Sequence, residues 1–357
     1  MHRIAVIPGD GIGKEVVPVG VDVLKALAEI SPGLDFEFEW HDYGADRYLR
    51  DGTGFPDDER QAIADRCDAI FLGAVGDPRV PGNEHARELI LETRFKLDLY
   101  VNLRPCRLVD PRLCPLANKT VDDVRFTVFR ENTEGLYVGA GGIFKKGTPH
   151  EVAIQTSINT AVGVERIIRR AYEYADANGL KRVCMSDKSN ALRFGHDIWQ
   201  RIWKKVAAEY PNIVSRHLYI DVLAMRLVRA PEEFDVIVTS NLFGDIITDL
   251  GAELQGGLGV ASSANVNPES GIGMFEPVHG SAPDIAGKGI ANPTATVLAA
   301  ALMIEHLGHA REARIIEKAV EDSLLAGACT PDLGGTLDTA GAAAYLISRV
   351  AELAPGM

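Results

Sequence analysis

Cysteine and long apolar runs are both scarce in this sequence. The five cysteines among 357 residues are odd in number, scattered, and include no CxxC pair. This argues against a disulfide framework or a cysteine-based zinc site and indicates a reducing compartment. The longest apolar run, near residues 295–304, is too short to span a bilayer. The N-terminal MHRIAVIPGDG turns polar too early for a signal peptide, so we expect a cytoplasmic protein.

Positive charge is also in short supply. Lys and Arg total 37 against 50 for Asp and Glu, which gives a net charge of −13. This balance argues against nucleic acid or an anionic membrane as the main partner and makes a divalent metal more plausible. At 357 residues and 46% hydrophobic content, the chain can form two domains or one large domain with a deep cleft.

One stretch, EPVHGSAPDIAGKGIANP at 276–293, has almost no periodicity and is followed directly by an apolar helix from about residue 295 to 307. Its glycines allow close backbone approach to a ligand, His279 offers a flat ring, and Asp284 offers two acceptor oxygens suited to a ribose diol. A glycine-rich connector between domains is the alternative interpretation of the loop taken alone.

The opening residues have the strand–glycine–helix order of a dinucleotide-binding unit. An apolar run at 4–8 leads into Gly9, Gly11 and Gly13, and an amphipathic helix follows from about residue 14 to 30. The spacing does not match the Rossmann fingerprint, because Lys14 stands where its third glycine belongs. We therefore expect a tight turn near a ligand and not a Rossmann fold.

Alternating strands and helices continue along the chain and predict an α/β fold with a mostly parallel sheet. We expect strands at 69–72, 125–131, 182–186, 217–220 and 234–240, and helices at 84–97, 197–210, 222–228, 245–254, 295–307 and 310–326, the last two closing the chain. The glycine-rich segment at about 133–158 reads as a protruding hairpin arm that completes a partner subunit. The predicted domains are 1–99 plus 252–357, and 100–251.

Acidic side chains gather where strands give way to helices. Asp221 follows the strand at 217–220, and Asp245 and Asp249 stand four apart on one helix face. Two crowded carboxylates repel unless a cation or proton joins them, and oxygen ligands favour Mg²⁺ or Mn²⁺. The alternative is acidic residues placed at a helix N-terminus by the dipole.

Three arginines, Arg94, Arg104 and Arg130, lie at element boundaries. Converging guanidinium groups would bind a dicarboxylic acid, although each arginine taken alone is more typical of a surface position. Lys188 after a strand could act as a base, and Tyr137 carries a phenol that could donate a proton.

Taken together, these motifs resemble the β-decarboxylating dehydrogenases, the family of 3-isopropylmalate, isocitrate, homoisocitrate, and D-malate or tartrate dehydrogenases. The resemblance covers essentially the whole chain. It rests on IPGDGIGKEV, YVNLRP at 100–105, RENTEGLY at 130–137, DKSN at 187–190, Asp221, NLFGDIITDL at 241–250 and the 276–293 loop. The opening motif departs from the family in having Lys14 in place of the usual proline.

The resemblance implies a two-domain fold of the isopropylmalate dehydrogenase type and a role for each candidate residue. Arg94, Arg104 and Arg130 would bind substrate carboxylates, Lys188 and Tyr137 would be catalytic, and Asp221, Asp245 and Asp249 would hold Mg²⁺ or Mn²⁺ beside the substrate. Lys188 and Asp221 would come from a partner subunit, which implies a homodimer with shared active sites. K⁺ is a further candidate cofactor.

The cofactor implied by the resemblance is a nicotinamide dinucleotide. Asp284 favours NAD, because a carboxylate accepts both ribose hydroxyls and repels a 2′-phosphate. The residues expected to contact the cofactor are Gly73, Ala74, Val75, Glu276, His279, Gly280, Ser281, Ala282, Asp284 and Asn292.

Substrate choice in this family depends on the helix before Arg94. Ile90 and Leu91 stand where isopropylmalate enzymes use a leucine pair, which favours an apolar substituent and hence leucine biosynthesis. Arg87 lies near a carboxylate-binding arginine of homoisocitrate enzymes, and Ala191 replaces a usual valine, as in the D-malate and tartrate branch. A non-catalytic regulatory subunit is a further alternative, which the complete set of ligand residues disfavours.

Overall fold

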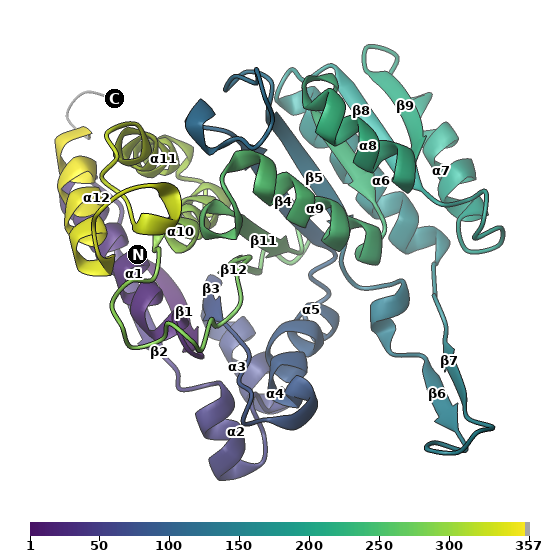
Figure 1. Cartoon of the computed structure of the whole chain (residues 1–357), viewed down its shortest axis with the longest axis horizontal. Helices are drawn as coiled ribbons and strands as arrows, with labels where there is room; N and C mark the ends of the chain where they lie inside the picture. Colours follow the sequence, from purple (N-terminus) through teal and green to yellow (C-terminus); the bar gives the residue numbers. More distant parts are fainter. Residues whose placement is uncertain (354–357) are drawn as a thin grey trace. The chain divides into compact units, whose positions relative to one another are not determined.

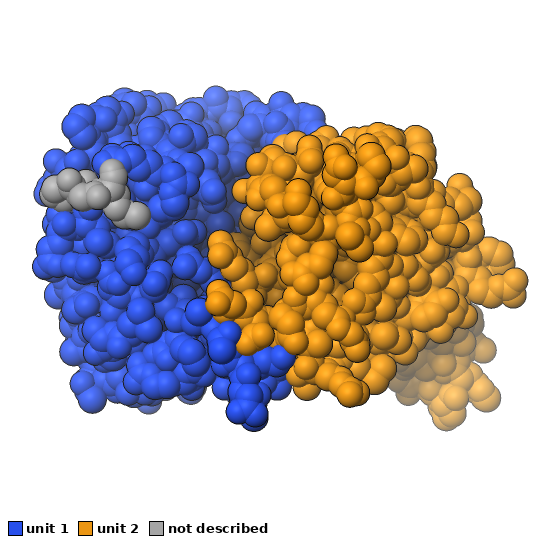
Figure 2. Space-filling view, turned by 90° about the horizontal axis from the view of Figure 1, so that it is seen from above, with its two compact units in different colours: residues 1–99, 107–121, 252–357 blue, residues 100–106, 122–251 orange. Residues whose placement is uncertain are grey.

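Strands alternate with helices along most of the chain, as the sequence predicts (Figure 1). The computed structural model describes residues 1–353. Unit 1 contains residues 1–99, 107–121 and the described residues from 252 onward, and unit 2 contains 100–106 and 122–251 (Figure 2).

Residues 107–121 lie in unit 1, whereas the sequence predicts that they belong to the domain at 100–251. Local contacts explain this placement. The backbone N–H of Arg107 donates to Gln255 Oε1 at 2.7 Å, and a guanidinium nitrogen of Arg112 donates to the carbonyl of Leu324 at 3.3 Å. Both partners belong to the C-terminal part of unit 1.

The strands of unit 1 follow the order β2 (Phe36–Trp40), β1 (His2–Gly9), β3 (Ala69–Ala74), β12 (Gly273–Pro277) and β11 (Ser262–Val266). β1 is parallel to both β2 and β3, β12 is parallel to β3, and β11 is antiparallel to β12. The carboxyl ends of β1, β3 and β12 therefore open into the loops that carry the predicted cofactor residues, the usual location of ligands in open α/β sheets.

Helices of unit 1 pack their apolar residues around these strands. They are α1 (Gly13–Ile30), α2 (Ala45–Asp51), α3 (Asp57–Arg66), α10 (Thr294–His306), α11 (Ala310–Leu325) and α12 (Thr339–Leu353). The expectation that the helix at 310–326 closes the chain was wrong, because α12 follows it. Its buried residues include Ala342, Leu346 and Val350, a four-residue repeat too narrow to stand out in an alanine-rich segment.

The helix predicted at 84–97 is built from three pieces. α4 (Glu84–Ala86) leads into a π-helix (Arg87–Glu92), and α5 (Thr93–Lys96) completes it. Short 3₁₀ turns elsewhere occupy Pro81–Asn83, Pro111–Leu113, Leu136–Val138, Pro231–Glu233, Leu258–Val260 and Pro331–Leu333.

In unit 2 the strand order is β4 (Val101–Arg107), β5 (Arg125–Glu131), β10 (Val236–Thr239), β8 (Arg182–Asp187) and β9 (Val214–Tyr219). β10 is parallel to β5 and β8, and β8 is parallel to β9. The helices are α6 (Ala161–Ala177), α7 (Asp197–Ala207), α8 (Ile220–Arg229) and α9 (Asn241–Gln255). The predicted α/β class with mostly parallel strands is confirmed.

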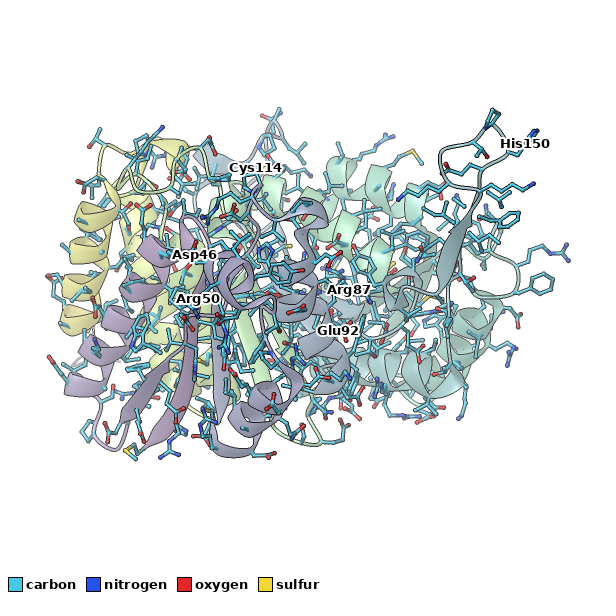
Figure 3. All side chains as sticks on the ribbon, turned by 90° about the horizontal axis from the view of Figure 1, so that it is seen from below. Asp46, Arg50, Arg87, Glu92, Cys114 and His150 are labelled. Carbon is cyan, nitrogen blue, oxygen red and sulfur yellow. The ribbon has the colours of Figure 1, made fainter. Side chains whose placement is uncertain are left out.

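An antiparallel hairpin, β6 (Gly141–Phe144) and β7 (Val152–Gln155), extends from the rest of unit 2, with His150 in its connecting turn (Figures 1 and 3). Every residue of both strands is exposed, including Phe144 and Ile154 at 64% and 61%. Across residues 1–353, no helix combines the length and the apolar composition needed to cross a bilayer.

Candidate functional site

Asp245 is the centre of a polar cluster within unit 2. Its Oδ1 accepts from Arg130 Nη1 at 2.6 Å, and its Oδ2 accepts from the Tyr137 hydroxyl at 2.8 Å. Arg104 Nη2 lies 3.7 Å from the same carboxylate. Although Arg104 and Arg130 are both buried, Asp245 is 37% exposed, so the cluster has an open side. Four residues predicted to act on substrate or metal are thus brought together.

Neighbouring side chains hold these arginines in place. The Arg130 guanidinium donates through Nε to Asn241 Oδ1 at 3.0 Å and lies over the Tyr137 ring at 5.2 Å. Arg104 Nη1 donates to Thr248 Oγ1 at 2.6 Å. Asn241 and Thr248 are both on α9, one at its start and one between the two aspartates, so a single helix positions the arginines and the carboxylates.

The position of Asp245 and Asp249 within α9 decides between the two sequence interpretations. α9 begins at Asn241, earlier than predicted, and its first turn contains no acidic residue. The helix dipole acts mainly on the first turn and does not account for these carboxylates. Burial, together with the charge of Asp245, raises the pKa of Asp249. This is expected for two neighbouring carboxyl groups whose repulsion a bound cation would offset.

Lys188 and Asp221 form a separate pair. The Lys188 ammonium donates to Asp221 Oδ1 at 2.5 Å, and this bond holds the pKa of Asp221 below its usual value. Asp221 lies in the first turn of α8, just after β9. Within residues 1–353, no three His, Cys, Asp or Glu side chains come close enough to hold a metal ion together. A single chain therefore provides the Asp245–Asp249 pair without Asp221.

Asp187, which is not among the candidate residues predicted from the sequence, fixes the loop that carries Lys188. It is fully buried and accepts from the backbone N–H of Ser189 at 3.1 Å, from Gln200 at 2.8 Å and from His217 at 2.9 Å. The available signal was a carboxylate directly after a buried strand, in the DKSN motif itself.

In unit 1 the glycine turn after β1 packs tightly against the predicted cofactor loop. The N–H of Ile12 donates to the Ser281 carbonyl at 2.9 Å, and a Cβ on Gly11 would lie 2.0 Å from that oxygen. Gly73 is equally constrained, since its Cβ would lie 2.2 Å from the Pro8 carbonyl. Ala282, next to Ser281, has φ of +40°, a strained conformation of the kind that accumulates at ligand sites.

Polar groups of the 276–293 loop differ in how they are engaged. His279 Nε2 is buried without a hydrogen-bond partner in the described chain, and burial lowers the pKa of this ring. Asp284 and Gly280 are exposed. Asn292 is already occupied: it donates to Asp332 at 2.9 Å and accepts from the N–H of Thr294 at the start of α10. His279 is therefore the group of this loop that most needs a ligand.

Arg94 and Glu276, predicted to bind substrate and cofactor respectively, bind each other within unit 1. Arg94 Nη2 donates to Glu276 Oε1 at 2.8 Å, and both side chains are nearly buried. Arg94 Nε has no partner among the described residues. One edge of this guanidinium is therefore left for another acceptor.

The two predicted pocket residues differ in their surroundings. Ile90 packs against the core cluster that contains Leu72, Leu89 and Met274, whereas Leu91 is half-buried and lies outside that cluster. Arg87 is exposed and pairs with Glu92 at 3.3 Å (Figure 3). Arg87 is therefore part of a surface ion pair, and Leu91 is the one of the two apolar side chains that does not pack against this core cluster.

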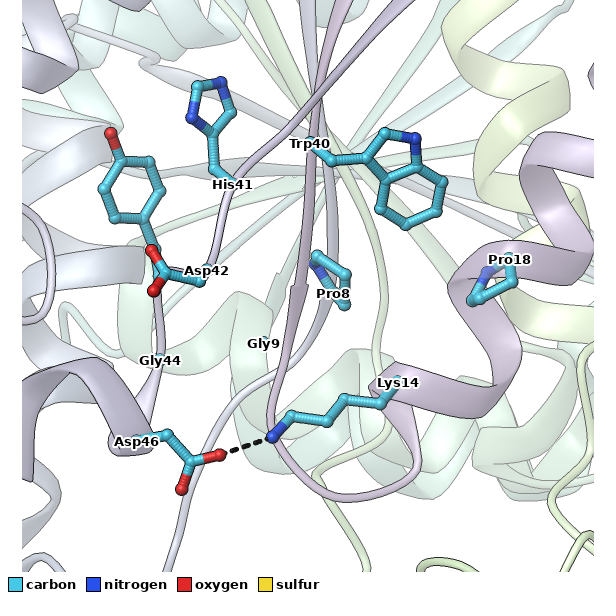
Figure 4. A pocket seen from close by; sticks show the side chains of 10 residues that line it. Pro8, Gly9, Lys14, Pro18, Trp40, His41, Asp42, Gly44 and Asp46 are labelled. Carbon is cyan, nitrogen blue, oxygen red and sulfur yellow. Dashed lines mark hydrogen bonds and ion pairs between the residues drawn. The ribbon is translucent and has the colours of Figure 1, made fainter.

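A cavity of about 400 Å³ lies between the start of α1 and the segment after β2 (Figure 4). Pro8, Pro18, Trp40 and the Lys14–Asp46 ion pair of 2.6 Å contribute to its lining. None of the residues predicted to bind substrate, metal or cofactor lines it, so it adds nothing to the candidate site.

Comparison with known proteins shows the family to which this chain belongs. The sequence profile described as isocitrate/isopropylmalate dehydrogenase matches residues 3–346. The chain belongs to this family. It is therefore an enzyme, and the prediction of a decarboxylating dehydrogenase of this family is confirmed.

Relatives within the family match over nearly the whole chain. A 3-isopropylmalate dehydrogenase of Thermobifida fusca is 47% identical over 98% of this chain and 98% of its own, and one of Bifidobacterium longum is 51% identical over 90% and 92%. Isocitrate dehydrogenase from Methylococcus capsulatus superposes with a TM-score of 0.88 at 38% identity, covering 98% of this chain and 100% of that one. A β-decarboxylating dehydrogenase from Thermococcus kodakarensis gives 0.80 at 37%, covering 100% and 98%.

Proposed function

We propose that the protein catalyses the NAD- and metal-dependent oxidative decarboxylation of (2R,3S)-3-isopropylmalate to 4-methyl-2-oxopentanoate and CO₂ in leucine biosynthesis. The observation that carries the proposal is the identity of 47–51%, over 90–98% of this chain, to relatives named 3-isopropylmalate dehydrogenase. The cluster in unit 2 supports it, because Arg104 and Arg130 complement the charge of a substrate carboxylate and the two aspartates offer oxygen ligands to a metal ion.

Arginine side chains supply substrate affinity in this proposal. The guanidinium groups of Arg104 and Arg130 lie beside Asp245, where they can donate to a substrate carboxylate. Arg94 offers its Nε edge to a second carboxylate. Because guanidinium–carboxylate pairs are bidentate and directional, they would orient C2 of the substrate as well as bind it.

Asp245 and Asp249 of one chain and Asp221 of a second chain would hold Mg²⁺ or Mn²⁺, ions that prefer carboxylate oxygens. The raised pKa of Asp249 supports a cation between the two carboxyl groups of α9. When bound, the ion polarises the 2-hydroxyl group and stabilises the negative charge that develops as CO₂ leaves.

Proton transfers are assigned to Lys188 and Tyr137. Lys188, from the partner chain, would remove the hydroxyl proton directly or through water, and its bond to Asp221 would place it beside the ion. The Tyr137 hydroxyl, held against Asp245, would return a proton to the enol carbon.

NAD would accept the hydride from C2, its adenosine lying on the 276–293 loop. The buried and unpartnered His279 Nε2 supports a hydrogen bond to the adenine, and the exposed Asp284 carboxylate is free to accept from the ribose hydroxyls. The glycines at 9, 11 and 73 allow close approach of the backbone segments around Pro8, Ala74 and Ser281, next to the residues proposed to bind NAD.

A cytoplasmic homodimer completes the proposal. The exposed hairpin β6–β7 carries four apolar side chains that are 47–64% exposed: Ile143, Phe144, Val152 and Ile154. Apolar residues gathered on a protruding arm mark an association surface. Within residues 1–353, Asp221 pairs with Lys188 and forms no three-residue metal cluster with the aspartates of α9, which supports a site completed by a second copy.

The decisive experiment measures NADH formation with Mn²⁺ and K⁺ for 3-isopropylmalate, D-malate, tartrate and homoisocitrate. We expect kcat/KM for 3-isopropylmalate to exceed the others by at least about 100-fold, since an apolar pocket gains 1–3 kcal/mol per methylene group. NADPH formation at a comparable rate would contradict the role of Asp284.

D-malate or tartrate is the second candidate substrate, favoured by Ala191. This residue is exposed in the Lys188 loop and leaves space where a larger side chain would close an apolar pocket. A preference for either acid would identify Ala191 as the residue that determines selection. Absence of metal-dependent NADH formation with every acid would instead indicate a regulatory subunit.

A further inference from the structure

One buried guanidinium holds the π-helical turn on which Ile90 and Leu91 lie. Arg60 on α3 is 1% exposed. Its Nη2 donates to the carbonyl of Glu88 at 3.0 Å, and its Nε donates to Thr93 Oγ1 at 3.1 Å. Glu88 and Thr93 are five residues apart, the spacing of a π-helical hydrogen bond, so Arg60 spans one wide turn from end to end.

A second set of bonds fixes Arg60 and the turn to the preceding loop. Arg60 Nη2 also donates to the Phe55 carbonyl at 2.8 Å, and Nη1 pairs with Asp57. In the opposite direction, Glu88 Oε2 accepts from the N–H groups of Gly54 at 2.6 Å and Phe55 at 3.1 Å. The loop at 53–55 and the turn at 88–93 are therefore tied to each other from both sides.

The register of this turn sets where the side chains between its anchors project. Each residue of an α-helix turns about 100° around the axis, so a change from π to α winding would redirect every side chain that follows. In the observed register both side chains are half-buried, and Ile90 packs against the core cluster of Leu72, Leu89 and Met274, to which Leu91 does not belong. π-helical turns are rare and poorly bonded, and an external group that occupies their carbonyl stabilises them.

We propose that Arg60 is a positioning residue for substrate selection, which rests on the proposed function. By bridging Glu88 and Thr93 it holds the π register of residues 87–92, keeps Ile90 in the core and directs Leu91 toward the substrate's 3-substituent. Arg60 touches neither substrate nor cofactor in this role. Because Thr93 precedes Arg94, the same bridge also steadies the arginine that pairs with Glu276.

The test is Arg60→Lys, since one ammonium group cannot reach two acceptors a full turn apart. We expect KM for 3-isopropylmalate to rise about tenfold or more with kcat changed less than about threefold, and the preference for 3-isopropylmalate over D-malate to fall about tenfold. If the substitution only reduces the amount of folded enzyme, the kcat values for 3-isopropylmalate and D-malate fall by the same factor and the preference ratio is unchanged. That outcome would overturn the proposal.

Amide hydrogen exchange supplies a readout that needs no activity. Exchange at residues 88–94 should accelerate in Arg60→Lys, while the amides of α1 stay unchanged. Unchanged exchange at 88–94 would overturn the proposal even where kinetics change. If the wild-type enzyme oxidises neither acid, the proposed function fails, and hydrogen exchange alone then decides whether Arg60 holds the turn.

Two further variants complete the test. Thr93→Val keeps shape but removes one of the two acceptors, and should change the preference ratio in the same direction by a smaller factor; it also serves if Arg60→Lys does not fold. Arg47→Lys is the matched control. Arg47 lies on α2 and pairs at 2.6 Å with Glu59, which is on the same helix as Arg60. Its ion pairs do not reach the turn, so exchange at 88–94 should match the wild type.

Discussion

Asp245 and Asp249 lie one turn apart on α9. We expect this pair to destabilise the folded protein without metal and to stabilise it when a metal ion is bound. Burial and mutual charge raise the pKa of Asp249, so the metal-free pair is destabilising. Asp249→Asn should therefore raise the melting temperature without metal by about 2 °C or more. With millimolar Mn²⁺ the wild type should gain stability and the variant should gain little, because a ligand is missing. Calorimetry with and without EDTA measures both effects.

The control is Asp322→Asn, an aspartate of unit 1 paired with Lys318 and Arg349 and distant in sequence from α9. Its response to Mn²⁺ should equal that of the wild type. An equal Mn²⁺ response in Asp249→Asn would exclude this carboxylate as a metal ligand.

Glu131, next to Arg130 at the end of β5, should make stability depend on pH. Burial raises the pKa of this carboxyl group from its ordinary value of 4.5 to about 7. A raised folded-state pKa means that its contribution to stability is complete below the unfolded value and is lost as pH rises toward 7. The loss amounts to about 3 kcal/mol, at about 1.4 kcal/mol per pKa unit.

Glu131→Gln removes this titration. Urea unfolding at pH 5 and pH 8 should show that the free energy of unfolding falls less between these pH values in the variant than in the wild type, by about 2.5 kcal/mol, because a small part of the loss is already complete at pH 5. The glutamine should also lower stability at pH 5, because it cannot accept from all of Thr133 N, Thr133 Oγ1 and Glu134 N. Equal pH slopes would show that these three donors keep the carboxylate ionised across the range.

At the scale of elements, the hairpin β6–β7 should hold two subunits together. Phe144 and Ile154 lie on one face of the hairpin, since Phe144 pairs with Val152 and Gly142 with Ile154. Burying each would contribute about 1.5–3 kcal/mol. The double variant Phe144→Asp, Ile154→Asp should therefore raise the dimer dissociation constant at least about 100-fold and abolish activity at low concentration. Sedimentation measures the mass.

The matched control is Leu49→Asp combined with Leu325→Asp. Both leucines are about half exposed on unit 1, and the two substitutions introduce the same charge as those in the arm. These substitutions should leave the mass unchanged. A dimer of wild-type affinity after the arm substitutions would remove the arm from the interface.

Local signals determined which elements could be predicted from the sequence. Thr160 caps α6 through a 3.0 Å bond from the Gly163 N–H, and threonine is a residue type that favours this position. The π turn at 87–92 was missed, because its register depends on Arg60, which is 27 residues away in the sequence. β11 and β12 were also missed, since their pairing is antiparallel and no helix connects them.

The same distinction applies to the candidate site. Each aspartate and arginine could be proposed from its place at an element boundary and from the family resemblance. The arrangement around Asp245 could not, because the bonds from Arg130 and Tyr137 join positions 115 and 108 residues apart. The Arg94–Glu276 pair, separated by 182 residues, was hidden for the same reason.

On the scale of the whole molecule, one chain holds two groups of candidate site residues. Asp245 and Asp249 lie with Arg104, Arg130 and Tyr137, while Lys188 pairs with Asp221, and the described residues contain no cluster of three metal-ligating side chains. A symmetric dimer would complete two sites at once, because each chain would give its Lys188–Asp221 pair to the other.

Subunit complementation tests this central claim most directly. Lys188→Ala and Asp245→Ala are each expected to be inactive alone. Mixed after dissociation and reassociation, they should regain about a quarter of wild-type activity, because half of the dimers are mixed and each of those has one intact site. Differently tagged chains confirm that mixed dimers form. Mixed dimers without activity would show that each chain builds its site alone, in contradiction to the shared site.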